Sequence, residues 1–211
     1  MTLRYKNIDL LLEMHRLKKD AIKQRLAEFK ALPPEHYFYE LVYCFMTPQS
    51  SAVNSLKAQQ TLASRDFERR EIDPEPLLHG KDYYIRFHKT KARLLVEMKR
   101  TYSEILRHVT DTSTALEKRA WLAENVKGLG YKESTHFLRN IGRNDGLAIL
   151  DRHILKNLRR HGVVRSIPRS LTKKMYLRTE MKFQEFAKAV GVPLDELDLV
   201  FWSNEAGEIL K

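Results

Sequence analysis

The chain carries one lysine directly after a turn that could bind a phosphate group. Gly128, Leu129 and Gly130 separate two apolar-periodic segments, and Lys132 follows two residues later. Two glycines around one apolar residue allow a tight helix-to-helix turn with Leu129 in the core. The backbone amides at the start of the second helix then form an anion site. An ordinary helical hairpin with a glycine cap is the alternative.

The position of Lys132 favours an amine that acts as a nucleophile. It lies in the first turn of the second predicted helix, where the positive end of the helix dipole disfavours an ammonium ion. A neutral lysine amine can attack an electrophilic carbon and form a Schiff base. Most lysines are solvated surface charges, so this interpretation depends on the adjacent phosphate-binding turn.

A single carboxylate follows the next apolar run. The run Gly146–Leu150 ends at Asp151, which we expect to cap a further helix through its side chain. A capping aspartate is also a fixed anion that could stabilise positive charge developing on a sugar. His153 lies close by, but no second ligand stands at metal-binding spacing. No metal is therefore expected.

The composition restricts the class of partner and the kind of site. The chain has 211 residues with 38 Lys and Arg against 27 Asp and Glu, a formal net charge of +11. Such a chain usually binds a polyanion, most often nucleic acid, although a generally basic surface is the alternative. The single cysteine, Cys44, excludes an internal disulfide and a four-cysteine zinc or iron–sulfur site. No membrane span or signal peptide is expected, which points to a cytoplasmic protein.

The elements that must position these residues are all predicted to be helical. Apolar residues recur at helical spacing from Leu11 to Phe29, and Pro33-Pro34 end that helix. No convincing alternation of β-branched residues is present, so the fold class is all-α. Four of the eight glycines, Gly128, Gly130, Gly142 and Gly146, fall in one stretch and predict unusual backbone geometry there. The other predicted helices cover His36–Met46, a segment from Ser50 or Ser51 through Leu62, Phe87–His108, Thr114–Asn125, a segment from Asp151, Leu171–Val190, and a last one from Pro193 through Trp202.

The segments Gly128–Asn140 and Ala148–Ile154 resemble the helix–hairpin–helix superfamily of DNA glycosylases, and specifically the second type of 8-oxoguanine DNA glycosylase/lyase. The likeness extends to Cys44–Pro48, to Arg86-Phe87, and from Leu197 to the last residue. It implies an all-α protein of two helical subdomains with a DNA-binding cleft between them. We expect residues 1–211 to form one compact glycosylase unit, with the hairpin and catalytic region at about 114–165.

The sequence departs from the family pattern at two places. Ser134-Thr135 stand where relatives often carry Ala-Ser, and Thr47-Pro48-Gln49 replaces the more usual Thr-Ala-Asn. The first change should leave the helix intact. No role is assigned to Gln49.

The resemblance also implies a bifunctional reaction on duplex DNA that contains 8-oxoguanine. Lys132 would attack C1′ of the damaged nucleotide, expel the base and form a Schiff base, and β-elimination would then cut the strand on the 3′ side. Asp151 would accept the lysine proton or stabilise the transition state. Gly128, Leu129 and Gly130 would bind the DNA backbone. We expect a monomer that requires neither a cofactor nor a metal.

Further residues are assigned to base extrusion and recognition. Arg86 and Phe87 would probe the gap left by the extruded base, although packing of Phe87 in the core is an equal alternative. The terminal carboxylate, on Lys211, would recognise the oxidised base. Trp202 would form a wall of the base pocket or pack in the core, and Asp198 would cap a helix end or accept a hydrogen bond in the pocket.

Two other functions stay open at the level of sequence. A related glycosylase could act on oxidised pyrimidines or mispaired adenine, but its common iron–sulfur members need four cysteines. A non-catalytic helix–hairpin–helix module would need the hairpin and the positive charge without Lys132 and Asp151.

Overall fold

The computed structural model describes residues 5–206, and side chains for residues 5–204. This part of the chain is helical, and its only β-type pairing is a single antiparallel bridge between His79 and Tyr84. The all-α prediction is confirmed. None of the described helices combines the length and apolarity needed to cross a bilayer.

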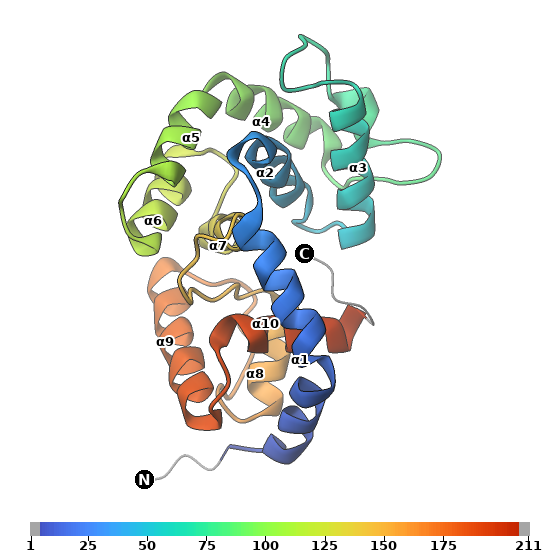
Figure 1. Ribbon diagram of the computed structural model, residues 1–211. Coiled ribbons are helices and arrows are strands. Elements are labelled where there is room, and N and C mark those ends of the chain that lie inside the picture. The colour runs from blue at the N-terminus through green and yellow to red at the C-terminus, as the bar shows by residue number, and fades with distance from the viewer. Residues whose placement is uncertain (1–4, 207–211) are drawn as a thin grey trace. The chain divides into compact units, whose positions relative to one another are not determined.

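Ten α-helices and two short 3-10 helices follow one another within residues 5–206 (Figure 1). They are α1 (Ile8–Ala31), η1 (Pro34–His36), α2 (Tyr37–Met46), α3 (Ala52–Ser64), η2 (Glu75–Leu78), α4 (His88–Arg100), α5 (Tyr102–Thr110), α6 (Ala115–Asn125), α7 (Tyr131–Asn140), α8 (Arg152–Arg160), α9 (Lys173–Val190) and α10 (Leu194–Ala206).

Side-chain caps begin several of these helices. Of the two serines predicted to cap α3, Ser51 does so, because its Oγ accepts a hydrogen bond from the Asn54 amide at 3.1 Å. Thr114 and Glu117 form a reciprocal capping box at α6. Gly191, in the left-handed conformation at φ 72°, ends α9 as predicted.

The single helix predicted over residues 87–108 is wrong, because the segment forms two helices. Thr101 lies between α4 and α5 with φ −103° and ψ 7°. Its backbone N–H donates to Met98 O at 3.1 Å, and its hydroxyl donates to the same carbonyl at 3.2 Å. A threonine that bonds back in this way competes with the regular helical ladder, which explains the break.

The chain divides into two compact units. Unit 1 comprises residues 1–30 and 144–210, and its described part contains most of α1 together with α8, α9 and α10. Unit 2 contains residues 31–143 and with them α2 through α7. The hairpin lysine belongs to unit 2, whereas Asp151 belongs to unit 1.

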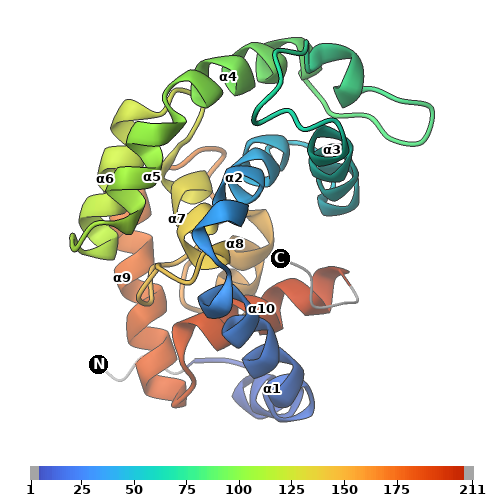
Figure 2. The ribbon, with the colours of Figure 1, turned by 45° about the horizontal axis from the view of Figure 1, so that its top comes forward.

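Helix α7 is the central element of unit 2. It packs against α2 and α6, and both views of the ribbon show it beside α2 (Figures 1 and 2). Every residue from Ser134 to Asn140 is buried, whereas the first turn, Tyr131–Glu133, is half-buried. The helix is therefore enclosed everywhere except at its N-terminal end.

Polar contacts fix α7 on both sides. The Asn140 side-chain amide donates to Glu40 Oε2 on α2 at 3.1 Å, and Gln59 on α3 donates to Glu40 Oε1 at 3.3 Å. On the other side, the guanidinium of Arg119, only 1% exposed, lies 5.0 Å from the ring centre of Tyr131. Buried polar groups need such partners, so these contacts specify one orientation of the helix.

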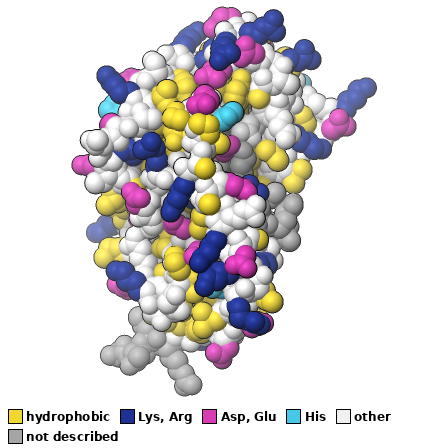
Figure 3. Space-filling model, in the orientation of Figure 1, with side chains coloured by type: hydrophobic (Ala, Val, Ile, Leu, Met, Phe, Trp, Pro, Cys, Tyr) yellow, Lys and Arg dark blue, Asp and Glu magenta, His cyan; other side chains and the backbone are white. Residues whose placement is uncertain are grey.

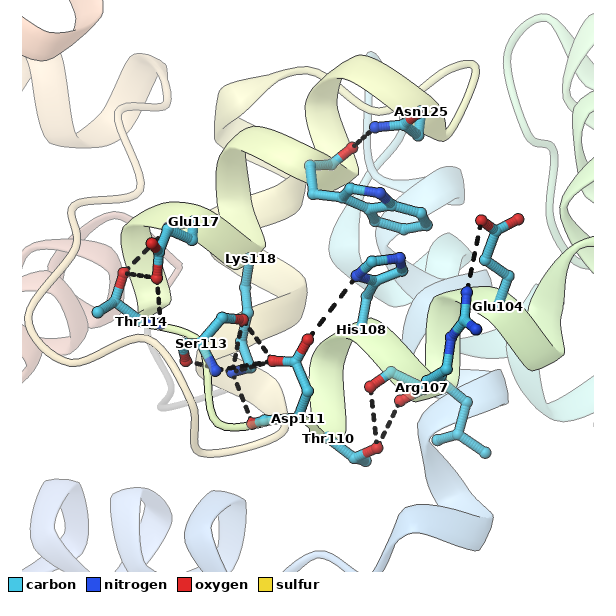
Figure 4. A network of polar contacts seen from close by, with 12 residues as sticks. Glu104, Arg107, His108, Thr110, Asp111, Ser113, Thr114, Glu117, Lys118 and Asn125 are labelled. Carbon is cyan, nitrogen blue, oxygen red and sulfur yellow. Dashed lines mark hydrogen bonds and ion pairs between the residues drawn. The ribbon is translucent and has the colours of Figure 1, made fainter.

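A buried lysine organises the connection from α5 to α6 (Figure 4). Lys118 Nζ donates to Asp111 O at 2.9 Å and lies 3.1 Å from Asp111 Oδ1, and it also contacts Ser113 O. Hydrogen bonds from Ser113 and from Lys118 hold the pKa of the Asp111 carboxyl well below its usual range. His108 stacks on Trp121 with ring centres 3.9 Å apart. The helix that leads into the hairpin is thereby anchored at its start.

A second buried lysine, Lys91 on α4, binds the C-terminal end of α2. Its Nζ donates to Met46 O at 2.7 Å and to Pro48 O at 2.8 Å, and lies 3.5 Å from Ser50 Oγ. Carbonyls at the end of a helix have no partner inside it, and the ammonium supplies one. Burial, together with the charge of Lys132, lowers the pKa of Lys91 from 10.5 to about 8, although Glu133 opposes this.

This pKa predicts an unusual dependence of stability on pH. Between about pH 8 and 10.5, Lys91 binds fewer protons in the folded chain than in the unfolded chain, so its burial penalty is relieved as the pH rises. We expect the free energy of unfolding of the wild type to gain about 1–2 kcal/mol over this range relative to Lys91→Met. Denaturant unfolding at several pH values measures the difference.

Lys89→Met is the matched control, because Lys89 is exposed on the same helix. Its pH dependence should follow that of the wild type. Parallel profiles for Lys91→Met and the wild type would contradict the lowered pKa.

Candidate active site

The hairpin between α6 and α7 requires glycine at its first position. Gly128 has φ 95°, and a Cβ there would lie 2.8 Å from Leu94 Cδ1 and 3.0 Å from Phe45 Cε1. Leu129 is buried, as predicted. Gly130 is extended, with φ −96° and ψ −175°, so the prediction of unusual backbone geometry is wrong at this position. Gly130 serves instead as the residue that precedes the first turn of α7.

The hairpin amides divide into those used within the turn and those directed out of it. The Leu129 amide donates to Val126 O at 3.0 Å, so it is not directed at a ligand. The first amide to donate within α7 is that of Ser134, to Gly130 O at 3.0 Å. The amides at residues 130–133 point out of the helix end, where the helix dipole is positive. An anion at this turn would therefore be bound by these amides.

Lys132 lies in the exposed first turn and has two polar neighbours. Its Nζ is 3.5 Å from Thr47 Oγ1 and 3.2 Å from Glu133 Oε1, and 24% of its side chain is exposed. Glu133 Oε2 in turn lies 3.2 Å from the position of a Cβ at Gly130. The carboxylate of Glu133 thus lies at the N-terminus of α7, where it is stabilised by the dipole and would compete with an incoming phosphate.

Lys91 and Ser50 connect this lysine to the Arg86-Phe87 pair. Thr47, which contacts Lys132, and Ser50 belong to one turn. Lys91 binds the Pro48 carbonyl on that turn and the Met46 carbonyl just before it. Ser50 Oγ accepts a hydrogen bond from the Arg86 amide at 3.0 Å. Sequence reasoning missed Lys91, because its role depends on contacts with residues more than forty positions away.

Phe87 is a surface residue with a strained backbone. It has φ 60° and ψ 33°, precedes α4 directly, and is 52% exposed. The Arg86 guanidinium lies 5.1 Å from its ring centre. Core packing of Phe87, one of the two sequence interpretations, is therefore wrong. Exposure of a large aromatic ring to water is unfavourable, and so is a left-handed backbone at a residue other than glycine. Their combination at Phe87 favours a functional role.

In unit 1, Asp151 caps α8 as predicted. Its side chain accepts a hydrogen bond from the Ile154 amide at 2.8 Å. Capping fixes the carboxylate at the start of the helix.

The buried segment before Asp151 is held by one face of α9. Tyr176 OH donates to Ala148 O at 2.5 Å and accepts from the Leu150 amide at 3.2 Å, and Glu180 Oε1 accepts from the Ala148 amide at 2.8 Å. This segment has no helix or sheet of its own, so side chains satisfy its backbone groups. Tyr176 and Glu180 were not predicted from the sequence, although they stand four residues apart, the spacing of one helix face.

The residues assigned to base recognition have different environments. Asp198 is buried in the interior of α10, so its predicted alternative role as a helix-end cap is wrong. Trp202 is half-buried on the same helix. Lys211 lies outside the described residues.

The positive charge is not gathered into one patch on the face drawn in Figure 3. Lys and Arg side chains are interspersed there with Asp and Glu. The electrostatic attraction for a polyanion on this face is therefore spread over many side chains rather than concentrated on one element.

Comparison with known proteins identifies the family. A family model described as 8-oxoguanine DNA glycosylase matches residues 22–192. The 8-oxoguanine DNA glycosylase/AP lyase of Fusobacterium nucleatum is 38% identical over 200 residues, which cover 90% of each chain. The protein of the same name from Korarchaeum cryptofilum is 34% identical over 208 residues, which cover 96% of this chain and 98% of that one.

Solved structures agree with the sequence matches. The 8-oxoguanine glycosylase/lyase of Methanocaldococcus jannaschii, in complex with a 15mer DNA containing 8-oxoguanine, has a TM-score of 0.84 at 32% identity, covering 96% of this chain and 99% of that chain. The 8-oxoguanine DNA glycosylase of Thermotoga maritima has a TM-score of 0.83 at 31% identity, with the same coverage. The predicted resemblance is confirmed: the chain belongs to the 8-oxoguanine DNA glycosylase family.

Proposed function

We propose that this protein excises 8-oxoguanine from duplex DNA and cleaves the strand at the resulting abasic site. One observation carries the proposal: in a chain of this family, Lys132 lies in the only part of α7 that is not fully buried, beside amides directed out of the helix end. A nucleophile and a phosphate-binding group are thereby adjacent on one rigid element.

The lysine amine performs the covalent chemistry. The unprotonated Nζ of Lys132 attacks C1′ of the damaged nucleotide, and the bond from C1′ to the base breaks. Loss of a proton from the nitrogen, with opening of the sugar ring, gives a Schiff base. Removal of a proton from C2′ then expels the 3′ phosphate by β-elimination. This sequence uses only side-chain acid and base groups.

Asp151 supplies negative charge to this reaction. We assign it to accepting the lysine proton or to stabilising the positive charge that develops on the sugar as the base leaves. Its hydrogen bond from the Ile154 amide keeps the carboxylate oriented, which reduces the reorganisation needed during the reaction.

The hairpin and Phe87 bind DNA from which the lesion has been extruded. Amides at residues 130–133 bind backbone phosphate without reading sequence. Extrusion of a base costs a few kcal/mol of stacking and pairing. Insertion of Phe87, with Arg86 beside it, into the vacated stack offsets part of this cost.

Recognition of the oxidised base is assigned to Lys211 and to α10. 8-Oxoguanine carries an N7–H donor where guanine has an acceptor, so a carboxylate beside the base would attract the first base and repel the second. Trp202 would pack against the base and Asp198 would accept a further hydrogen bond.

The central prediction concerns the nucleophile. Lys132→Gln removes the amine but keeps a side chain of similar length, so borohydride trapping of the enzyme on 8-oxoguanine duplex should fall below detection, with affinity for the duplex changed less than about threefold. Covalent adducts on denaturing gels and binding by fluorescence anisotropy provide the two measurements.

Lys127→Gln is the matched control, because Lys127 is an exposed lysine of the same hairpin that pairs with Glu97. It should trap at the wild-type level. Trapping that survives in Lys132→Gln would remove Lys132 from the mechanism, and absence of trapping in the wild type would favour a non-catalytic binding module.

Asp151→Asn separates capping from catalysis. Asparagine caps helices about as well as aspartate, so the melting temperature should change by less than about 2 °C. Loss of the negative charge should lower the single-turnover rate of excision by about 100-fold or more. An unchanged rate would leave Asp151 with a structural role only.

Phe87→Ala tests the extrusion role. Because the ring is exposed, its removal should leave the melting temperature nearly unchanged while excision from duplex falls at least about tenfold. Excision from a single strand, where no pairing is broken, should fall much less. Leu116→Ala, which removes another large exposed side chain of unit 2, is the control, and equal losses in both variants would contradict the prediction.

A further inference from the structure

Three metal-ligating side chains converge in unit 2 where η2 meets α4. Glu75, His79 and His88 each offer one ligand atom, and these atoms all lie within 4.8 Å of one another. Glu75 Oε1 is 3.9 Å from His88 Nε2. None of the three was assigned a role in the site described above.

The backbone that carries these residues is ordered by local hydrogen bonds. Glu75 stands between two prolines, and its amide donates to Asp73 Oδ1 at 2.9 Å. His79 pairs with Tyr84 through the single β-bridge, at the base of a short loop. His88 is the first residue of α4, which packs against η2. The ligand set is therefore built on fixed elements rather than on a loose chain.

The side chain of His88 has a nitrogen without a hydrogen-bond partner, which a metal-binding role of the ring would explain. Its Nδ1 is buried and has no hydrogen-bond partner among residues 5–204. The His79 and His88 rings lie with their centres 4.5 Å apart and their planes at 52°. A buried nitrogen left without a hydrogen bond costs free energy. Binding of a metal ion by the His88 ring would compensate part of this cost.

We propose that Glu75, His79 and His88 form a zinc-binding site whose fourth position is open to water. Two imidazoles and one carboxylate are a ligand set that zinc uses where one position is left open. Imidazole ligands disfavour magnesium and calcium, which prefer oxygen.

The geometry needs only a small adjustment to hold the ion. Tetrahedral zinc with ligands at about 2.0–2.1 Å places its ligand atoms about 3.4 Å apart. The atoms found up to 4.8 Å apart must therefore approach by up to about 1.4 Å. His79 is exposed, so its side chain can rotate to close this gap.

A zinc ion at this position would restrict the conformation of the Arg86-Phe87 pair. His88 directly follows Phe87, whose φ of 60° is strained. A metal that joins His88 to Glu75 and His79 would fix the start of α4 and with it the direction of the Phe87 ring. The metal site itself does not depend on the proposed repair function.

Zinc binding to the untagged full-length chain tests the proposal. After removal of metals by a chelator, isothermal titration should give one zinc per chain, and zinc should raise the melting temperature. Glu75→Gln and His79→Ala should each weaken binding at least about tenfold. X-ray absorption of the zinc complex should show nitrogen and oxygen ligands without sulfur, since Cys44 is buried in the core.

His36→Ala is the control, because His36 is another exposed histidine of unit 2. It should bind zinc as the wild type does. The proposal is overturned if binding is not saturable, if it survives unchanged in Glu75→Gln and His79→Ala, or if His36→Ala weakens it equally. Melting temperatures of the metal-free variants confirm that each chain is folded, so a loss of binding is not mistaken for unfolding.

Discussion

The burial of α7 is the constraint on which the candidate site depends. Seven consecutive residues, Ser134–Asn140, are buried, and α7 packs against α2 and α6. The contacts of Asn140 with Glu40 and of Tyr131 with Arg119 further restrict the orientation of the helix. Only the first turn reaches solvent. A lysine two positions into that turn is held by the rigidity of a helix instead of by a loop, and such placement reduces the motion that a nucleophile must lose before it reacts.

The second constraint is the turn at residues 47–50. Lys91 donates to the Pro48 carbonyl of this turn and to the Met46 carbonyl just before it, and the turn contacts Lys132 through Thr47 and the Arg86 amide through Ser50. A buried ammonium is costly, and its lowered pKa records that cost. The cost is offset because the Lys91 ammonium supplies a hydrogen-bond donor to three groups, Met46 O, Pro48 O and Ser50 Oγ. Lys132 and Arg86 are thus both connected, through this turn, to one buried group.

The features that could be predicted from the sequence are those that depend on residues close together along the chain. The caps at Ser51 and Asp151 and the burial of Leu129 depend on neighbouring residues, and the structure confirms them. The break at Thr101 was missed because a threonine that bonds back to the preceding turn looks the same in sequence as one that continues the helix.

Contacts between distant segments could not be predicted from one sequence. Lys91 and the face of α9 that binds residues 146–150 act on backbone groups far along the chain, and the Glu75, His79 and His88 side chains meet only because η2 packs on α4. The backbone of Phe87 is a related case, since nothing in its type suggests φ 60°. An asparagine or glycine would adopt that conformation with about 1 kcal/mol less strain. Either residue at this position would therefore relieve backbone strain in the free protein, at the loss of the contact between the Phe87 ring and the Arg86 guanidinium.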